Sequence, residues 1–223
     1  MNSLTPFNNK NSFLLSEPVD YLKPAELLDI LRAVDLHYDN SSKTDHNTWM
    51  RDRDKLLFQV LWTTGARISD VLDIRTENIK IKEQSITFLV HKRRSKKAVY
   101  GGEFWHTISL DLQTLTDILE YMQVWSIKSG LLFTANISKP QPLTRAAVNK
   151  KLNQLTASIN MRHVHPHMFR HGLAMHLQSQ GVPVEVIAFR LAHSSTAITL
   201  QTYARMNIQQ EKSILEALNV QLR

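Results

Sequence analysis

Four short motifs, far apart in the chain, together carry the side chains that a tyrosine would need to attack a phosphodiester. Each motif alone is weak evidence, because Arg, His and Tyr are common residues. Their order and spacing, however, match one reaction class, the transfer of DNA strands. The motifs are Thr64-Gly65-Ala66-Arg67-Ile68-Ser69-Asp70, a basic segment around Lys92, His167-Met168-Phe169-Arg170-His171, and Leu191-Ala192-His193 followed by Tyr203.

Two arginines, Arg67 and Arg170, are the candidates for stabilising the transition state. Attack on a phosphodiester passes through a pentacoordinate phosphorus whose non-bridging oxygens carry extra negative charge. Planar guanidinium groups donate paired hydrogen bonds to such oxygens and stay charged at any working pH. A single arginine is more often a surface or phosphate-positioning residue, and here the flanking residues favour a catalytic role.

Tyr203 is the candidate nucleophile. A phenol with a pKa near 10 reacts poorly at neutral pH, so it needs a nearby proton acceptor and a positive field. His167 can accept a hydrogen bond or a proton near the phosphate, and His193, ten positions before Tyr203, can donate to a non-bridging oxygen. Without these neighbours, a helical tyrosine would more often be a packing residue.

The leaving 5′ oxygen needs a proton, and a strongly basic segment can supply it. Residues 92–97 contain five basic side chains in six positions, in a predicted hairpin tip. One of them can act as the general acid. Most of them would instead grip backbone phosphates as a solvated run of charge.

A cluster of histidines permits a second interpretation, a metal site. His167 and His171 have the i,i+4 spacing that can share one ion. Against a metal, no His-Glu-x-x-His pattern is present and no acidic residue lies between Asn160 and Val184. Because two arginines and a lysine would supply the positive charge of an ion, we expect no metal or other cofactor. The full cluster is His163, His165, His167, His171 and His176.

Composition is consistent with a DNA-bound protein. The 223 residues, 43% of them hydrophobic, are enough for one large domain or two small ones. A net charge of +7 and a pI near 9.7 favour a polyanionic partner. The absence of cysteine suits a reducing compartment, and no apolar run reaches the length of a membrane span or a signal peptide. We therefore expect a cytoplasmic, DNA-associated protein with no membrane contact and no small-molecule substrate.

Hydrophobic periodicity predicts a mainly α-helical fold with one small antiparallel β-sheet. Residues 1–20 are predicted to be a tail or linker, and residues 21–223 a catalytic domain with a C-terminal helical tail. Asp39–Thr48 is predicted to be a loop. Strands are expected at Ser85–Val90 and Phe104–Leu110. In the first half of the chain, helices are expected from Pro24, across Leu56–Leu61 up to Thr63-Thr64-Gly65, and from Arg67. Later helices are expected across Leu112–Met122, across Val148–Ile159 with Thr144 as its cap, from Pro166 to Gly181, and at 183–191, 196–205 and 207–220.

Taken together, these residues resemble the tyrosine recombinases, also called the phage integrase family. The Arg67 segment is similar to the family's first arginine motif, with Asp70 where an acidic residue is usual. His167-x-x-Arg170-His171 is similar to its His-x-x-Arg box, and His193 and Tyr203 to its final histidine and nucleophile. The resemblance covers about residues 22–205.

The resemblance implies a tyrosine-recombinase catalytic domain that acts on a double-stranded DNA recombination site through a 3′-phosphotyrosine link. Arg67, Arg170 and His193 would stabilise the phosphorane, His167 would assist proton movement and Tyr203 would attack. It further implies a homo-oligomer on DNA, a tetrameric synapse, and no cofactor. Lys92, at the end of a strand, is the first choice for the catalytic lysine, which leaves Arg93, Arg94, Lys96 and Lys97 as DNA-binding residues.

The sequence departs from the family pattern in several places. The last histidine usually follows a Leu-Gly pair, but here it follows Leu191-Ala192, and Tyr203 comes one position later than usual. Only about twenty residues precede the match, so the chain is either a fragment or a minimal recombinase. Other functions also remain: a type IB topoisomerase uses similar groups, a DNA-binding regulator could keep the fold without catalysis, and a metal-dependent nuclease would need a carboxylate cluster that is missing.

Overall fold

The computed structural model describes residues 20–40, 44–90 and 104–192. Two long helices come first in this part of the chain. Helix α1 spans Pro24–Asp39, with proline at its first position, where a missing N–H is harmless. Helix α2 spans Asp45–Thr64, and the Thr44 hydroxyl accepts a hydrogen bond from Asn47 N–H at 3.2 Å. The predicted loop over Asp39–Thr48 is therefore too long, because its last residues form the capped first turn of α2.

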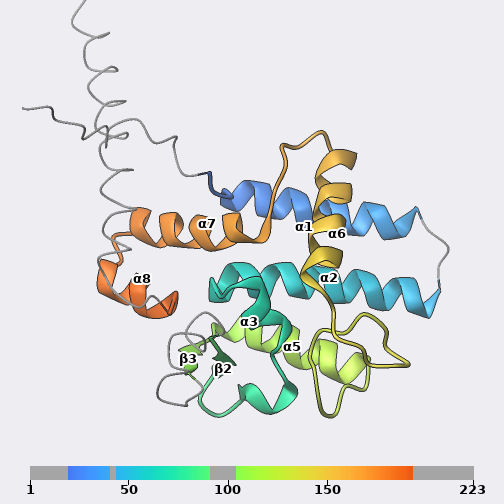
Figure 1. Ribbon diagram of the computed structural model, residues 1–223, viewed down its shortest axis with the longest axis horizontal. Helices are drawn as coiled ribbons and strands as arrows, with labels where there is room; N and C mark the ends of the chain where they lie inside the picture. Colours follow the sequence, from blue (N-terminus) through green and yellow to red (C-terminus); the bar gives the residue numbers. More distant parts are fainter. Residues whose placement is uncertain (1–19, 41–43, 91–103, 193–223) are drawn as a thin grey trace, which may run out of the picture. The chain divides into compact units, whose positions relative to one another are not determined.

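Helix α2 is the central element of the helical part. It contacts α1, α5 and α7, and Figure 1 shows it running between α1 and α7 on one side and α5 on the other. Leu57, Val60 and Leu61 on this helix are almost completely buried, as the sequence pattern predicts. The helix ends at Gly65, which has the left-handed backbone conformation (φ 60°) typical of a helix C-terminus.

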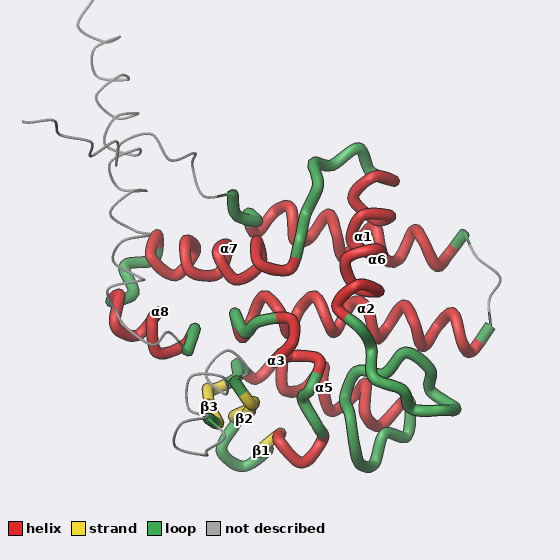
Figure 2. The backbone as a smooth tube through the Cα atoms, viewed as in Figure 1, coloured by secondary structure: helices red, strands yellow, loops and turns green. Residues whose placement is uncertain are grey.

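Three antiparallel strands form the small sheet, in the order β1-β2-β3 (Figure 2). They are β1 (Ile79–Lys80), β2 (Ser85–Leu89) and β3 (Trp105–Ser109), and Ile86 pairs with Ile108. The two predicted strands are confirmed to within one residue at each end. Strand β1 was not predicted, because two residues are too short to show an alternating pattern.

The remaining helices follow the predicted order, and the mainly helical fold with a small antiparallel sheet is confirmed. As predicted, the Thr144 hydroxyl caps its helix by accepting from Ala147 N–H at 3.1 Å. The expected helices at 196–205 and 207–220 lie outside the described residues. The helices are α3 (Ile68–Leu72), the 3-10 turn η1 (Thr76–Asn78), α5 (Leu112–Val124), α6 (Arg145–Ser158), α7 (Pro166–Ser179) and α8 (Val184–Arg190).

A buried polar network stabilises the half of α2 that is nearer its N-terminus. Arg53 donates from Nε and Nη2 to Asp54 Oδ1 at 2.9 and 2.6 Å, and Nη1 donates to the Thr134 carbonyl at 3.0 Å. The Tyr38 hydroxyl donates to the other Asp54 oxygen at 2.8 Å. Both charges are thus paired and hydrogen-bonded, as burial requires.

Among the described helices, none is long and apolar enough to cross a membrane.

We predict that Asp54→Ala lowers the free energy of unfolding by about 3–5 kcal/mol, because it leaves the Arg53 charge buried without its partner. Asp35→Ala is the control, because the N–O distance in its ion pair with Lys55 is 2.8 Å, close to the 2.6 Å of Arg53–Asp54. The Lys55 and Asp35 side chains are, however, 36% and 39% exposed, whereas those of Arg53 and Asp54 are 7% and 3% exposed. An exposed pair contributes less than about 1 kcal/mol. Urea titration measures the free energy of unfolding of both variants. Equal losses of stability would contradict the stabilising role of the buried Arg53–Asp54 pair.

Candidate active site

Arg67 lies at the turn between α2 and α3, where its backbone carbonyl starts the short helix. It is the N-cap of α3, and Val71 N–H donates to its carbonyl oxygen at 2.9 Å. The Arg67 Nη1 atom lies 3.7 Å from Asp70 Oδ2, which is too long for a hydrogen bond. This nitrogen is nevertheless buried, and the described residues place no acceptor within hydrogen-bond distance of it. Asp70 therefore supplies a compensating charge while leaving a buried donor available for an anion.

Arg170 connects the other two motifs to the Arg67 segment. It lies in α7, with only 6% of its surface exposed. Its Nη1 donates to the Gly65 carbonyl at 2.7 Å, and its Nη2 donates to the Leu191 carbonyl at 2.6 Å. One guanidinium thus holds together the turn before Arg67, the His-x-x-Arg helix and the residues just before His193. Of the third motif, the structure describes only Leu191 and Ala192.

Close packing at Gly65 explains why that turn needs glycine. A Cβ atom there would lie 2.6 Å from Leu191 Cδ2 and 2.8 Å from Leu173 Cδ2. Its positive φ is also costly for any other residue. The α2–α3 turn therefore packs directly against α7 and the end of α8, which brings Arg67 towards Arg170.

The start of α7 is held by the segment in front of α1. Leu22 is completely buried, and its N–H donates to the Met168 carbonyl at 3.0 Å. A Cβ at Gly172 would lie 2.2 Å from the Leu22 carbonyl oxygen, so the two backbones touch. Arg162, just before α7, donates to both Glu26 carboxylate oxygens at 2.8 and 2.9 Å, which lowers the pKa of Glu26. These contacts fix the helix that carries His167 and Arg170.

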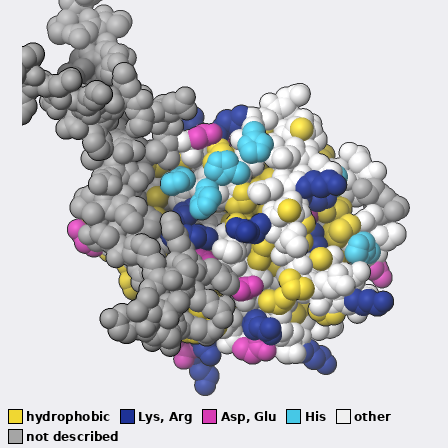
Figure 3. Space-filling model, in the orientation of Figure 1, with side chains coloured by type: hydrophobic (Ala, Val, Ile, Leu, Met, Phe, Trp, Pro, Cys, Tyr) yellow, Lys and Arg dark blue, Asp and Glu magenta, His cyan; other side chains and the backbone are white. Residues whose placement is uncertain are grey.

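Several histidines gather on the face that carries the start of α7 (Figure 3). His167 is exposed in the first turn of the helix, and its ring lies 6.5 Å from that of His171. Burial lowers the pKa of His171, and the neighbouring charges of His167 and Arg170 lower it further. Its neutral form is therefore favoured near pH 7. Among the described residues, no three His, Asp or Glu side chains are placed to hold a metal ion.

Ala192 accounts for one departure of this sequence from the family pattern. It follows α8 with a left-handed backbone (φ 50°), and its N–H donates to the Phe189 carbonyl at 2.8 Å. Glycine adopts this conformation without strain, whereas alanine does not. The Leu-Gly pair usual in the family therefore suits this backbone, and the present chain keeps the conformation with alanine.

Sequence reasoning missed Arg190, which fixes α8. Its Nη2 and Nε donate to the Thr63 carbonyl at 2.7 and 3.1 Å, so the last turn of α8 is tied to the end of α2. Burial lowers the pKa of this guanidinium, although Asp111 opposes the shift. No local pattern marks Arg190, because its acceptor lies 127 positions away in the sequence.

The other predicted site residues lie outside the described residues, and their assignments stay predictions. They are Lys92, Arg93, Arg94, Lys96, Lys97, His193 and Tyr203.

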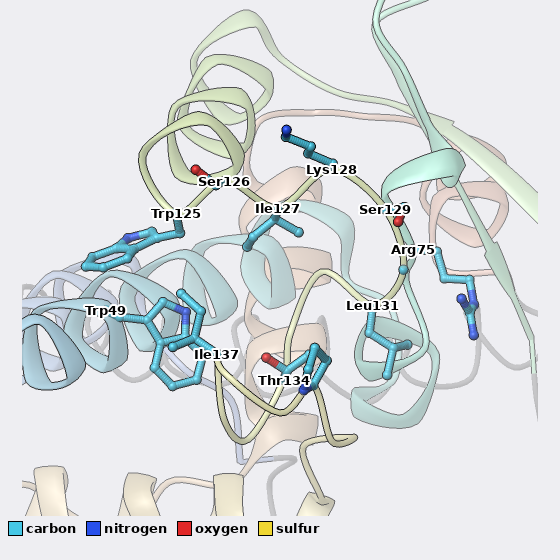
Figure 4. A pocket seen from close by; sticks show the side chains of 12 residues that line it. Trp49, Arg75, Trp125, Ser126, Ile127, Lys128, Ser129, Leu131, Thr134 and Ile137 are labelled. Atoms are coloured by element: carbon cyan, nitrogen blue, oxygen red, sulfur yellow. The ribbon is translucent and has the colours of Figure 1, made fainter.

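A pocket of about 480 Å³ lies well away from the two arginines. Figure 4 shows the indoles of Trp49 and Trp125 on one side of it and Arg75 on the other. Trp49 is near the N-terminus of α2, roughly 22 Å along the helix from Thr64 at 1.5 Å per residue. Of the predicted site residues that the structure describes, Arg67, His167 and Arg170, none lines the pocket. The arginine site is therefore not part of this pocket.

Comparisons with known proteins agree on one family. The family model described as "Phage integrase family" matches residues 26–210. Tyrosine recombinase XerC of Staphylococcus epidermidis is 27% identical over 173 residues, 76% of this chain and 55% of the relative. Tyrosine recombinase XerA of Pyrococcus furiosus is 27% identical over 169 residues, 75% of this chain and 55% of the relative. The chain thus spans about half the length of the curated relatives it matches.

Solved structures share the fold. XerH site-specific recombinase bound to difH substrate superposes with a TM-score of 0.60 and 20% identity, over 82% of this chain and 49% of that one. The catalytic domain of bacteriophage HP1 integrase superposes with a TM-score of 0.54 and 17% identity, over 83% and 88% of the two chains.

The backbone at Ala192 gives a test of the turn that leads to His193. Ala192→Gly should raise the free energy of unfolding by up to about 1 kcal/mol, because relief of left-handed strain outweighs the added freedom of the unfolded chain. Ala188→Gly, inside helix α8, should lower it by about 1 kcal/mol. Denaturant unfolding measures both, and destabilisation of similar size in the two variants would contradict the conformation at residue 192.

Proposed function

Because the chain belongs to the phage integrase family, we propose that it is a site-specific DNA recombinase that cleaves and rejoins strands through a 3′-phosphotyrosine intermediate. The observation that carries this proposal is the pair of hydrogen bonds from Arg170 to Gly65 and Leu191. These bonds join α7 to Gly65 and Leu191, which belong to three motifs that the reaction needs close together. The names of the relatives, which are tyrosine recombinases, favour recombination over topoisomerase-like relaxation or a silent regulator.

In the proposed reaction, the Tyr203 oxygen attacks the scissile phosphorus and the bond to the 5′ oxygen breaks. Arg67 and Arg170 stabilise the charge on the non-bridging oxygens with fixed donors, and His193 donates a further hydrogen bond. His167 accepts the phenol proton, and Lys92 protonates the leaving 5′ oxygen. A 5′ hydroxyl then displaces the tyrosine by the reverse steps. One phosphodiester replaces another, so bond energy is conserved and the reaction needs no nucleotide.

The proposed arrangement assigns different tasks to the two arginines. The buried Nη1 of Arg67 makes no hydrogen bond with the described residues, so it is suited to donate to the phosphate directly. Arg170 binds two carbonyls and so positions the site as well as adding charge.

The partners follow from the same proposal. The substrate is a double-stranded DNA recombination site. Four basic residues, Arg93, Arg94, Lys96 and Lys97, bind part of its backbone. The protein is cytoplasmic and associated with DNA. The chain acts as a homo-oligomer on DNA, a tetramer that holds two sites together. An apolar stripe after Tyr203, which lies outside the described residues, either docks on a neighbouring protomer or packs on its own core. It comprises Ile208, Leu215, Leu218 and Leu222.

We predict that Tyr203→Phe abolishes the covalent protein–DNA adduct while leaving DNA affinity nearly unchanged, because only the nucleophilic oxygen is lost. The assay is a denaturing gel with a nicked duplex carrying a site selected from random DNA. Tyr121→Phe is the control and should still form the adduct, since Tyr121 is buried and its hydroxyl accepts from Trp49. An adduct that persists in Tyr203→Phe, or that maps to Tyr100, would overturn the assignment.

Loss of either arginine should slow cleavage, and loss of Arg170 should also destabilise the fold. Arg67→Ala should slow cleavage at least about a hundredfold, as expected for loss of one preorganised donor. Arg170→Ala should slow cleavage similarly and also cost about 1–3 kcal/mol of stability, because two buried carbonyls lose their donor. Single-turnover cleavage and urea unfolding test this, with exposed Arg32→Ala as the control. Cleavage at the normal rate by Arg67→Ala would exclude its proposed role.

A further inference from the structure

Four imidazoles form a continuous row that leads away from the proposed catalytic centre. This histidine row consists of His163, His165, His167 and His171. Successive ring centroids are 6.2, 6.4 and 6.5 Å apart. His167 and His171 lie on α7, whereas His163 and His165 lie on the segment that enters it. His163 is exposed and His165 is partly exposed, so both are accessible next to a residue of the site.

Few negative charges face the histidine row. No Asp or Glu occurs between Tyr121 and Val184, a range that includes the whole row. Asp20 and Glu26 approach from the segment before α1 and from α1 itself, but both are ion-paired with Arg162. Arg170 on α7 adds positive charge beside His171.

This setting favours the neutral forms of His165 and His171, whose pKa values are both lowered. Burial lowers the pKa of His165, the His163 charge lowers it further, Asp20 opposes this and Arg162 reinforces it. An anion that touches the row would reverse these effects, because it stabilises the charged imidazolium. Binding of a polyanion and uptake of protons must then favour each other.

We propose that His163 and His165 bind phosphates of the DNA strand beside the scissile phosphate, and that they do so as imidazolium ions. This inference rests on the proposed function, which places DNA at His167. A strand whose phosphate lies at His167 and Arg170 meets His165 and then His163 next along the row. A run of single positive charges suits successive phosphates of a backbone, whereas a metal ion needs ligands that converge on one point. DNA affinity therefore rises as the pH falls.

The test measures the affinity of the full chain for duplex DNA at pH 7.5, 7.0, 6.5 and 6.0, at constant ionic strength. The native chain should bind about tenfold more tightly at pH 6.0 than at pH 7.5, which corresponds to uptake of about 0.7 proton on binding, averaged over that range. The double variant His163→Gln/His165→Gln should lose most of this pH dependence and show a smaller salt dependence. The single variant His163→Gln, at an exposed position, should lose part of it, and His46→Gln at the far end of α2 should lose none.

Three outcomes would overturn the proposal. The first is an unchanged pH dependence in the double variant. The second is loss of the pH dependence of the native chain when EDTA is added, which would show that the row holds a metal ion. The third is loss of the pH dependence in His46→Gln as well as in the double variant.

A separate readout keeps the proposed function distinct from this inference. The covalent adduct is measured at pH 7.5 in the same preparations. Adduct formation by the double variant, together with a flattened pH dependence, supports phosphate binding by the row. Failure of the native chain to form any adduct would reject the proposed reaction, whereas the binding curves would still decide whether the row contacts DNA.

Discussion

The site depends on one buried guanidinium whose acceptors are backbone carbonyls. Arg170 donates to Gly65 and to Leu191, which lie 105 and 21 positions away in the sequence. Because a buried carbonyl without a donor costs free energy, each of these segments is held in place by the same charge. Glycine at position 65 completes the arrangement, since a Cβ there would meet the methyl groups of Leu173 and Leu191 and its φ is positive. Arg67, two residues after Gly65, is positioned as a consequence.

The two ends of α2 show how the same kinds of residue serve different purposes. In the half nearer the N-terminus, Arg53 and Asp54 are matched at 2.6–2.9 Å, with Tyr38 and Thr134 completing their hydrogen bonds. Just beyond the C-terminus, Arg67 stays 3.7 Å from Asp70 and keeps a buried nitrogen without an acceptor among the described residues. The first arrangement is satisfied internally and stabilises the fold. The second is incomplete, as expected where an external anion must bind.

Local signals in the sequence predicted most of the helices, because caps and breakers act over a few residues. Thr144, Pro166 and Gly65 lie where such signals place them. The failures have physical causes: the polar residues after Thr44 occupy the exposed first turn of a capped helix, and β1 is too short to show periodicity. Long-range contacts could not be predicted at all. Arg162 and Arg190 find their acceptors 136 and 127 positions away, and no sequence pattern records such pairings. The predicted roles of Lys92, His193 and Tyr203 lie beyond the described residues.

The segment in front of α1 is bound directly to α7, the helix that carries His167 and Arg170. Leu22 is hydrogen-bonded to Met168, its carbonyl touches Gly172, and Arg162 is bound to Asp20, Tyr21 and Glu26. A displacement of the backbone at Asp20 is therefore transmitted directly to α7. Arg170 lies about one turn along that helix, so a displacement of the helix start also displaces Arg170. A fusion partner joined rigidly at this point would act as a lever on the site, whereas one joined through a flexible spacer would not.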